Sequence, residues 1–144
     1  MADKSINLLI VEDDQDWLRG LAAYLSGEPD IRIAATASTS EEALAAMAEQ
    51  EFDVVLMDIM LASNVEGIWL TSHITASSAA RVIMLTSLED KEMIFEAFRA
   101  GAVDYHIKSD FKSIPEAVRS AYAKRSPINP EVAEKMREEF RRLK

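Results

Sequence analysis

The chain has 144 residues, of which 49% are apolar and 28% charged, and its formal net charge is −9. This length and balance fit one globular domain with a substantial buried core, and the excess of acids favours cations and basic partners over nucleic-acid phosphates. Cysteine is absent, which excludes disulfides, thiolate metal sites and thiol nucleophiles.

Apolar runs of strand length alternate with segments of helical period along most of the chain. Strands are predicted over 6–11, 31–37, 53–58, 81–87 and 103–107, and helices over 14–26, 41–50, 67–75, 89–100 and 111–124. Asp14 is expected to cap the first helix, and Thr39 or Ser40 the second. Five strand–helix units with mostly apolar strands predict a doubly wound α/β fold, in which helices cover both faces of a parallel sheet.

The composition changes after residue 125. Pro127 and Pro130 bracket a break, and a charged segment of helical period follows them. Its apolar residues form a single stripe: Val132, Met136, Phe140 and Leu143. We therefore expect one domain over 1–125, followed over 126–144 by a linker or an extra C-terminal amphipathic helix.

No signal peptide is visible at the start of the sequence, and the longest apolar runs are too short to span a bilayer. A cytoplasmic protein without a membrane partner is therefore expected.

Polar side chains collect where the predicted strands end. The first strand is followed by Glu12 and Asp13, the third ends in Asp58, the fourth delivers Thr86 and the fifth Lys108. The carboxyl ends of parallel strands form the ligand crevice of such sheets. Carboxylates crowded there repel one another unless a hard divalent cation, most plausibly Mg²⁺, lies among them. A cation, an ammonium and a hydroxyl around a carboxylate form a cradle for a phosphoryl group.

Four stretches at these strand ends resemble the receiver domain of bacterial two-component response regulators, over residues 5–125. They are LLIVEDD (8–14), VVLMDIML (54–61), VIMLTS (82–87) and GAVDYHIK (101–108). The resemblance implies a flavodoxin-like (βα)5 fold with strand order 2-1-3-4-5. It also implies a signalling switch rather than an enzyme, phosphorylated by a sensor histidine kinase.

Site roles follow from the same resemblance. Asp58 is implied to be the phosphoacceptor and also one of the Mg²⁺ ligands. Glu12 and Asp13 are the implied metal pair, with Asp13 the direct ligand and Glu12 acting through water, and the backbone carbonyl of Met60 completes the protein's share of the Mg²⁺ shell.

The remaining implied roles concern the phosphoryl group and the switch. Thr86 would hydrogen-bond a phosphoryl oxygen, Lys108 would pair with another, and Tyr105 would follow the inward movement of Thr86. The partner-binding face would then be helix four, strand five and helix five, around residues 90–120. A homodimer is expected through this face or through the C-terminal helix, with no direct nucleic-acid contact by this chain.

The sequence departs from the family after its lysine and after its acceptor. Ser109 follows Lys108, where the family usually has a cis-proline, so the bond is either cis at a cost of about 2.5–4 kcal/mol or trans with a rebuilt loop. Ala62 replaces a common proline and Gly67 stands one residue late, which predicts a looser segment over 61–66.

The lifetime of the phosphorylated form depends on the neighbours that admit the hydrolytic water. Met60 and Leu88, two residues beyond Asp58 and Thr86, are both apolar. Neither side chain can orient a water molecule, so slow self-dephosphorylation is expected.

Alternative interpretations remain at this stage. A haloacid-dehalogenase-type phosphohydrolase would need a second aspartate at the position of Met60, and a degenerate receiver would bind partners without phosphorylation. The segment 126–144 resembles the linker before the helix-turn-helix output domain of NarL/FixJ-type transcription regulators, which would make the chain a fragment of such a regulator. Alternatively, this segment is an added helix that docks on its own domain or on a second copy of the chain. His73 and His106 are predicted to be structural, and Trp17 to pack near the site.

Overall fold

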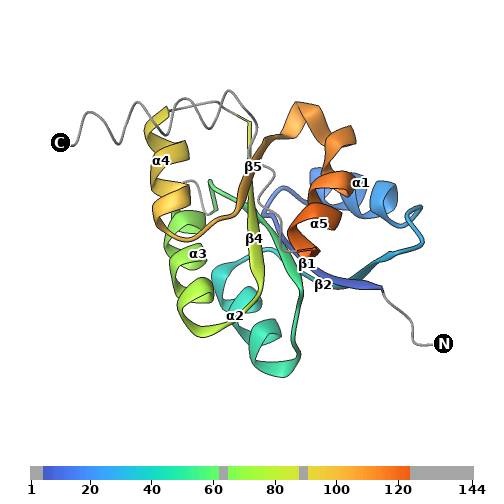
Figure 1. Ribbon diagram of the computed structural model, residues 1–144, viewed down its shortest axis with the longest axis horizontal. Helices are drawn as coiled ribbons and strands as arrows, with labels where there is room; N and C mark the ends of the chain where they lie inside the picture. The colour runs from blue at the N-terminus through green and yellow to red at the C-terminus, as the bar shows by residue number, and fades with distance from the viewer. Residues whose placement is uncertain (1–4, 62–64, 88–90, 124–144) are drawn as a thin grey trace.

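A computed structural model describes residues 5–61, 65–87 and 91–123, and Figure 1 shows a central sheet between two layers of helices. The five strands are parallel and lie in the order β2-β1-β3-β4-β5. In chain order the elements are β1 (Ile6–Val11), α1 (Gln15–Leu25), β2 (Ile31–Ala37), α2 (Ser40–Glu49), β3 (Val54–Asp58), α3 (Glu66–Ser77), β4 (Arg81–Thr86), α4 (Lys91–Arg99), β5 (Asp104–Ile107), the 3-10 helix η1 (Lys108–Ser113) and α5 (Ile114–Tyr122). The predicted fold class and strand order are confirmed.

The sheet is buried on both faces, which explains why its strands are apolar throughout. Alternate residues of β1 point to opposite sides: Leu9 and Val11 pack in a core with α2, α3 and α4, whereas Leu8 and Ile10 pack in a second core with α1 and α5. Figure 1 shows these two groups of helices on opposite sides of the sheet. No helix among the described residues is long and apolar enough to cross a membrane.

The expected caps are present. The Asp14 carboxylate accepts from the backbone N–H groups of Asp16 and Trp17, and the Thr39 hydroxyl accepts from that of Glu42. After α4, Gly101 has a φ of 112°, and a Cβ there would lie 2.6 Å from Oγ1 of Thr75. A glycine is therefore required where α4 turns towards β5.

The last predicted helix, 111–124, is wrong at its start. The chain instead forms η1 directly after β5, and α5 begins only at Ile114, with Pro115 in its first turn. Asp110 has non-helical angles (φ −98°, ψ 44°) that interrupt the helical path, and a proline favours the first turn of a helix over its interior. The other described boundaries coincide with the prediction or differ from it by at most two residues, which is within the fraying of element ends.

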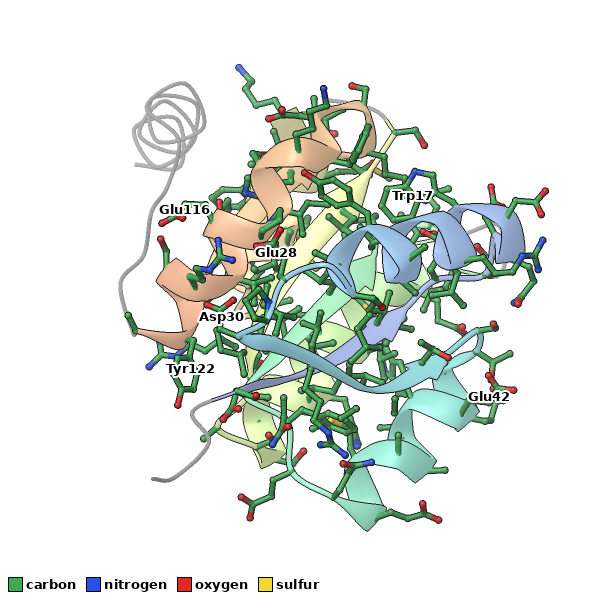
Figure 2. All side chains as sticks on the ribbon, turned by 90° about the vertical axis from the view of Figure 1, so that its right-hand side faces the viewer. Trp17, Glu28, Asp30, Glu42, Glu116 and Tyr122 are labelled. Atoms are coloured by element: carbon green, nitrogen blue, oxygen red, sulfur yellow. The ribbon has the colours of Figure 1, made fainter. Side chains whose placement is uncertain are left out.

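An ion-pair cluster joins α5 to the loop before β2. The Arg119 guanidinium donates to the carboxylates of Asp30, at 2.8 Å from Nε to Oδ2, and of Glu28. Glu28 and Asp30 lie beside α5 in Figure 2. The hydrogen bond from Arg119 lowers the pKa of Asp30, but the pair is half-exposed and stabilises the fold only modestly.

Several expectations fall outside the described residues. These are the looser loop after Asp58 in its part 62–64, the apolar residue Leu88, the start of the fourth helix before Lys91, and the whole segment 126–144. The domain boundary at residue 125 therefore stays a prediction.

Gly67 brings the start of α3 against the end of β3. Its N–H donates to the carbonyl of Ile59 at 3.0 Å. A Cβ at this position would lie 2.0 Å from the carbonyl oxygen of Asp58, which is far inside van der Waals contact with rigid backbone. The glycine at this position thus helps to fix where Asp58 lies.

We predict that Gly67→Ala lowers the free energy of unfolding by about 1–3 kcal/mol, because the new methyl group must displace the backbone. Gly20→Ala is the matched control: nothing lies within 4 Å of a Cβ there, and alanine in the interior of α1 stabilises a helix by roughly 0.5–1 kcal/mol over glycine. Urea unfolding of both variants measures the difference. Equal stability of the two variants would contradict this packing.

Candidate functional site

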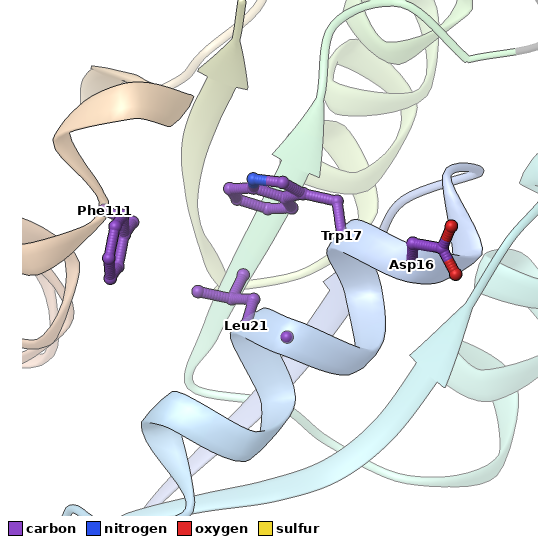
Figure 3. Close-up of a pocket in the computed structure, with 5 residues that line it drawn as sticks. Asp16, Trp17, Leu21 and Phe111 are labelled. Atoms are coloured by element: carbon purple, nitrogen blue, oxygen red, sulfur yellow. The ribbon is translucent and has the colours of Figure 1, made fainter.

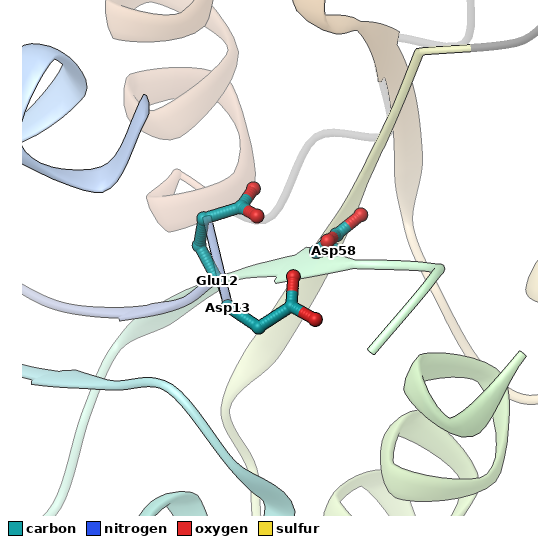
Figure 4. A group of neighbouring side chains, drawn as sticks. All are labelled: Glu12, Asp13 and Asp58. Atoms are coloured by element: carbon teal, nitrogen blue, oxygen red, sulfur yellow. The ribbon is translucent and has the colours of Figure 1, made fainter. Parts of the chain in front are cut away.

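Three carboxylates converge where β1 and β3 end. One oxygen from each of Glu12, Asp13 and Asp58 lies within 4.8 Å of the others, and Figure 4 shows Asp13 and Asp58 turned towards the same space with Glu12 beside them. The cause is the parallel pairing of the strands, which sets Val11 opposite Met57 and so places the residues that follow side by side. Glu12 and Asp58 are buried and Asp13 is exposed, so the cluster opens to solvent on one side.

Lys108 reaches this cluster from the end of β5. Its Nζ lies 2.6 Å from Oε1 of Glu12 and 3.6 Å from Oδ2 of Asp58. The described residues contain no cis peptide bond, so the Lys108–Ser109 bond is trans and the loop is built as η1. The structure thus decides between the two alternatives left open by the sequence, and the lysine still reaches the carboxylates.

The electrostatics of the cluster call for more positive charge than Lys108 supplies. Burial, and then the neighbouring charge of Glu12, raise the pKa of Asp58 to about 7, although Lys108 acts in the opposite direction. Carboxylate oxygens at this spacing are the ligands that hard divalent cations prefer. The residues therefore fit a site for Mg²⁺ or a similar ion.

Backbone N–H groups two residues further along the chain hold the carboxylates of Asp58 and Glu12 in place. The Met60 N–H donates to Oδ1 of Asp58 at 3.2 Å, and the Asp14 N–H donates to Oε2 of Glu12 at 2.9 Å. Asp14 itself is used as the cap of α1, as predicted, rather than as a member of the cluster. The Met60 side chain is 38% exposed, beside the mouth of the site.

Thr86 and Tyr105 lie on the neighbouring strands β4 and β5. Both are buried, at 2% and 4% exposure. Because Asp58 pairs with Leu85 in the sheet, Thr86 follows directly at the same edge as the carboxylates. Tyr105 packs in the core on the α3 and α4 side. The structure therefore brings Glu12, Asp13, Asp58, Thr86 and Lys108 to the same end of the sheet, whereas Tyr105 lies in the core between the sheet and the helices α3 and α4.

Trp17 packs near the site as predicted, but two contacts there were not predicted from the sequence. The Lys108 ammonium lies 4.8 Å from the centroid of the Trp17 ring, a cation–π contact, and the spacing of Trp17, four residues after Asp13 on the first turn of α1, was the available signal. His106 is hydrogen-bonded to Asp104 and Ser113, which no local pattern could indicate because Ser113 comes from the misassigned segment.

An apolar hollow of about 240 Å³ lies near the acidic cluster but is distinct from it. It is lined by Asp16, Trp17, Gly20, Leu21 and Phe111, and Figure 3 shows Trp17 of α1 facing Phe111 of η1 across it. A lining of this kind does not suit an anion or a metal ion. This hollow is therefore not a second site for a metal ion or a phosphoryl group.

Comparison with known proteins gives concordant findings. Residues 8–119 match the family described as response regulator receiver domain. Over 141 residues the chain is 33% identical to response regulator protein VraR of Staphylococcus aureus, and the match covers 96% of this chain but only 66% of that protein's length.

Two solved structures are similar as well. The crystal structure of a two-component response regulator of the LuxR family from Aurantimonas sp. SI85-9A1 is 28% identical, with a TM-score of 0.83 over 97% of this chain and 99% of that one. The RcsB response regulator of Salmonella typhimurium, at 14% identity, shares the fold with a TM-score of 0.80 over 93% of this chain and 68% of that one.

The raised pKa of Asp58 predicts how stability depends on pH in metal-free solution. Since the carboxyl binds its proton more tightly in the folded state, the free energy of unfolding should fall as pH rises from the ordinary value of 3.8 through about 7. Asp58→Asn should remove this loss and be the more stable protein at about pH 8, by at least about 1.4 kcal/mol, the free energy of one pKa unit. Urea unfolding with chelator at about pH 5 and about pH 8 measures it. A wild-type protein that matches Asp58→Asn at both pH values would refute the repulsion.

Proposed function

The chain belongs to the response regulator receiver domain family, and from this membership we propose that it is a signalling switch phosphorylated on Asp58. Response regulators act in two-component signal transduction and are signalling proteins rather than ordinary enzymes. Sensor histidine kinases phosphorylate them, and receiver domains generally bind Mg²⁺ through acidic residues such as those clustered here. The proposed donor is accordingly the phosphohistidine of a sensor histidine kinase.

The observation that carries the proposal is the convergence of the Glu12, Asp13 and Asp58 carboxylates with the Lys108 ammonium at one edge of the sheet. One Asp58 oxygen attacks phosphorus in line, and the P–O bond forms as the P–N bond to the donor imidazole breaks and the imidazole leaves with the bonding pair. A bound Mg²⁺ supplies positive charge that neutralises the phosphoryl oxygens.

The chain's own residues have separate tasks in this transfer. Glu12, Asp13 and Asp58 would hold the cation, with the Met60 carbonyl proposed as a further ligand. Lys108 exchanges its present partner Glu12, at 2.6 Å, for a phosphoryl oxygen, because the new anion carries more charge than one carboxylate. The Thr86 hydroxyl donates to another phosphoryl oxygen.

The output follows from a shift in population. The phosphoryl group favours the state in which Thr86 has moved inward, and Tyr105 adjusts in the space that Thr86 vacates. This alters the face formed by α4, β5 and α5, which is the proposed surface for partners and for a homodimer. Pairing through the segment 126–144 is the alternative route to a dimer. Similarity to a LuxR-family regulator favours transcription as the process controlled, and a cytoplasmic location stays a prediction.

The rival functions are less well supported. A dehalogenase-type phosphohydrolase needs a general acid two residues after the nucleophile, and Met60 cannot supply one. A degenerate receiver was suggested by Ser109, but Lys108 reaches both Glu12 and Asp58 across a trans bond. Both observations favour a receiver that is phosphorylated.

We predict that acetyl phosphate with Mg²⁺ adds one phosphoryl group to the chain, and that Asp58→Asn abolishes the addition because the nucleophile is lost. Intact-mass spectrometry reads the modification, and size-exclusion chromatography reads any dimer that forms with it. Asp53→Asn is a matched control, since Asp53 lies at the opposite edge of the sheet, before β3. Addition to Asp58→Asn equal to that of the wild type would overturn the assignment.

We also predict slow loss of the phosphoryl group, because the exposed Met60 side chain beside Asp58 cannot orient water. Met60→Asn should shorten the half-life by about tenfold, less than the roughly 10²–10⁴-fold of a full general acid or base, because an amide can only orient the water. The decay is followed by intact mass after removal of the donor. A half-life of seconds that polar substitution at Met60 and Leu88 leaves unchanged would contradict the role of these two positions.

A further inference from the structure

A buried carboxylate on β5 takes no part in the acidic cluster. Asp104 is 3% exposed, and a charge at such a depth is retained only when it is paired or hydrogen-bonded. Its Oδ1 accepts from the Tyr105 N–H at 2.8 Å, and its Oδ2 lies 3.1 Å from Nε2 of His106. Asp104 is therefore bound to the strand and to one imidazole.

The imidazole continues this contact to the far end of η1. Nδ1 of His106 lies 3.0 Å from Oγ of Ser113, the last residue of the 3-10 helix whose first residue is Lys108. When Nε2 carries a proton it donates to the Asp104 carboxylate, and Nδ1 then shares the single Ser113 hydroxyl proton with the carbonyl oxygen of Asp110, 2.8 Å from Oγ. Because side chains alternate along a strand, positions 104 and 106 share one side of β5, and Lys108 follows the end of that strand. The polar chain Asp104–His106–Ser113 thus spans the segment that carries the lysine.

The contact between His106 and Ser113 stabilises η1, which is weak by itself. It is a 3-10 helix of six residues that is interrupted by the non-helical Asp110, and 3-10 geometry is weakly hydrogen-bonded. None of its six residues is buried. The Phe111 ring packs edge-to-face on Tyr24 of α1, with centroids 5.2 Å apart, and holds the middle of the segment, whereas the His106–Ser113 contact joins its end to the sheet.

Serine, histidine and aspartate in series also suggest a nucleophilic triad, but the surroundings argue against one. The Ser113 hydroxyl lies 3.0 Å from Oδ2 of Asp110 and 2.8 Å from its carbonyl oxygen. These acceptors compete with His106 for the one hydroxyl proton, whereas a serine nucleophile needs that proton directed at its base. The series is suited to holding structure in place.

We propose that His106 and Ser113, held by Asp104, are positioning residues that fix Lys108 at the acidic cluster. The proposal rests on the proposed function, since it assigns what orients the lysine of the phosphoryl site. Without the His106–Ser113 contact, η1 becomes less well ordered, and the Lys108 ammonium then spends less time within reach of Glu12 and Asp58. A misplacement of about 1 Å in such a group costs about ten- to a hundredfold in rate.

The test measures the rate of phosphorylation of the full chain by acetyl phosphate and Mg²⁺, by intact mass, over a range of donor concentrations. His106→Ala and Ser113→Ala should lower the maximal rate about ten- to a hundredfold. His106→Gln keeps one donor and one acceptor and should recover most of the rate. The controls are His73→Ala and Ser77→Ala on the exposed face of α3, which should react like the wild type.

A double-mutant cycle separates positioning from a general structural effect. In the Lys108→Ala background, His106→Ala should cause no further loss of rate, because its whole effect passes through the lysine. In a Trp69→Phe background, where Trp17 is the one remaining tryptophan, His106→Ala should shift the Trp17 emission in the same direction as Lys108→Ala does. This emission reports on the 4.8 Å contact between Lys108 and the Trp17 ring without any phosphorylation.

The outcomes are distinguishable. A wild-type chain that gains no phosphoryl group on Asp58 defeats the proposed function. The emission experiment then still tests whether His106 positions Lys108. A wild type that reacts while His106→Ala and Ser113→Ala react equally fast overturns the positioning role, as does a full additional loss in the Lys108→Ala background. Should His106→Ala fail to fold, Ser113→Ala and His106→Gln carry the same comparison.

Discussion

Repulsion among carboxylates at the end of the sheet is the constraint on which the site depends. Glu12 and Asp58 are both buried, and one lysine ammonium within 3.6 Å of each cannot balance them together with Asp13. The raised pKa of Asp58 expresses this imbalance. A divalent cation would supply the positive charge that the fold leaves short, and only with that charge in place would the site accept an anionic phosphoryl group.

The fold maintains this repulsion by distributing the acids over separate strands. Parallel pairing of β1 with β3 brings their ends to the same edge, and neither strand can shift without disturbing the two cores that it separates. Gly67 adds a local constraint, since the start of α3 lies against the Asp58 carbonyl and leaves no room for a side chain. The packing of the apolar sheet thus holds the carboxylates together despite their mutual repulsion.

Lys108 supplies the positive charge that faces these acids. It arrives from the edge strand β5, two strands away from Asp58, and its backbone continues into a short 3-10 helix that is not buried. The Trp17 ring and the polar series Asp104, His106 and Ser113 border this segment from α1 and from β5. An ammonium that must change partners when a phosphoryl group arrives benefits from a defined position with weak local structure around it.

The sequence by itself determined the fold class, the strand order through a family resemblance, and the residues that end each strand, because apolar runs, helical periods and caps such as Asp14 are local patterns. It could not determine the path after Lys108. There the helical period of 111–124 suggested one helix, whereas the angles of Asp110 and the position of Pro115 divide it into η1 and α5. Only the tertiary structure decided that Lys108 reaches Glu12 across a trans bond, and that His106 meets Ser113, because these contacts depend on how a chain segment folds back over the sheet rather than on the order of its residues.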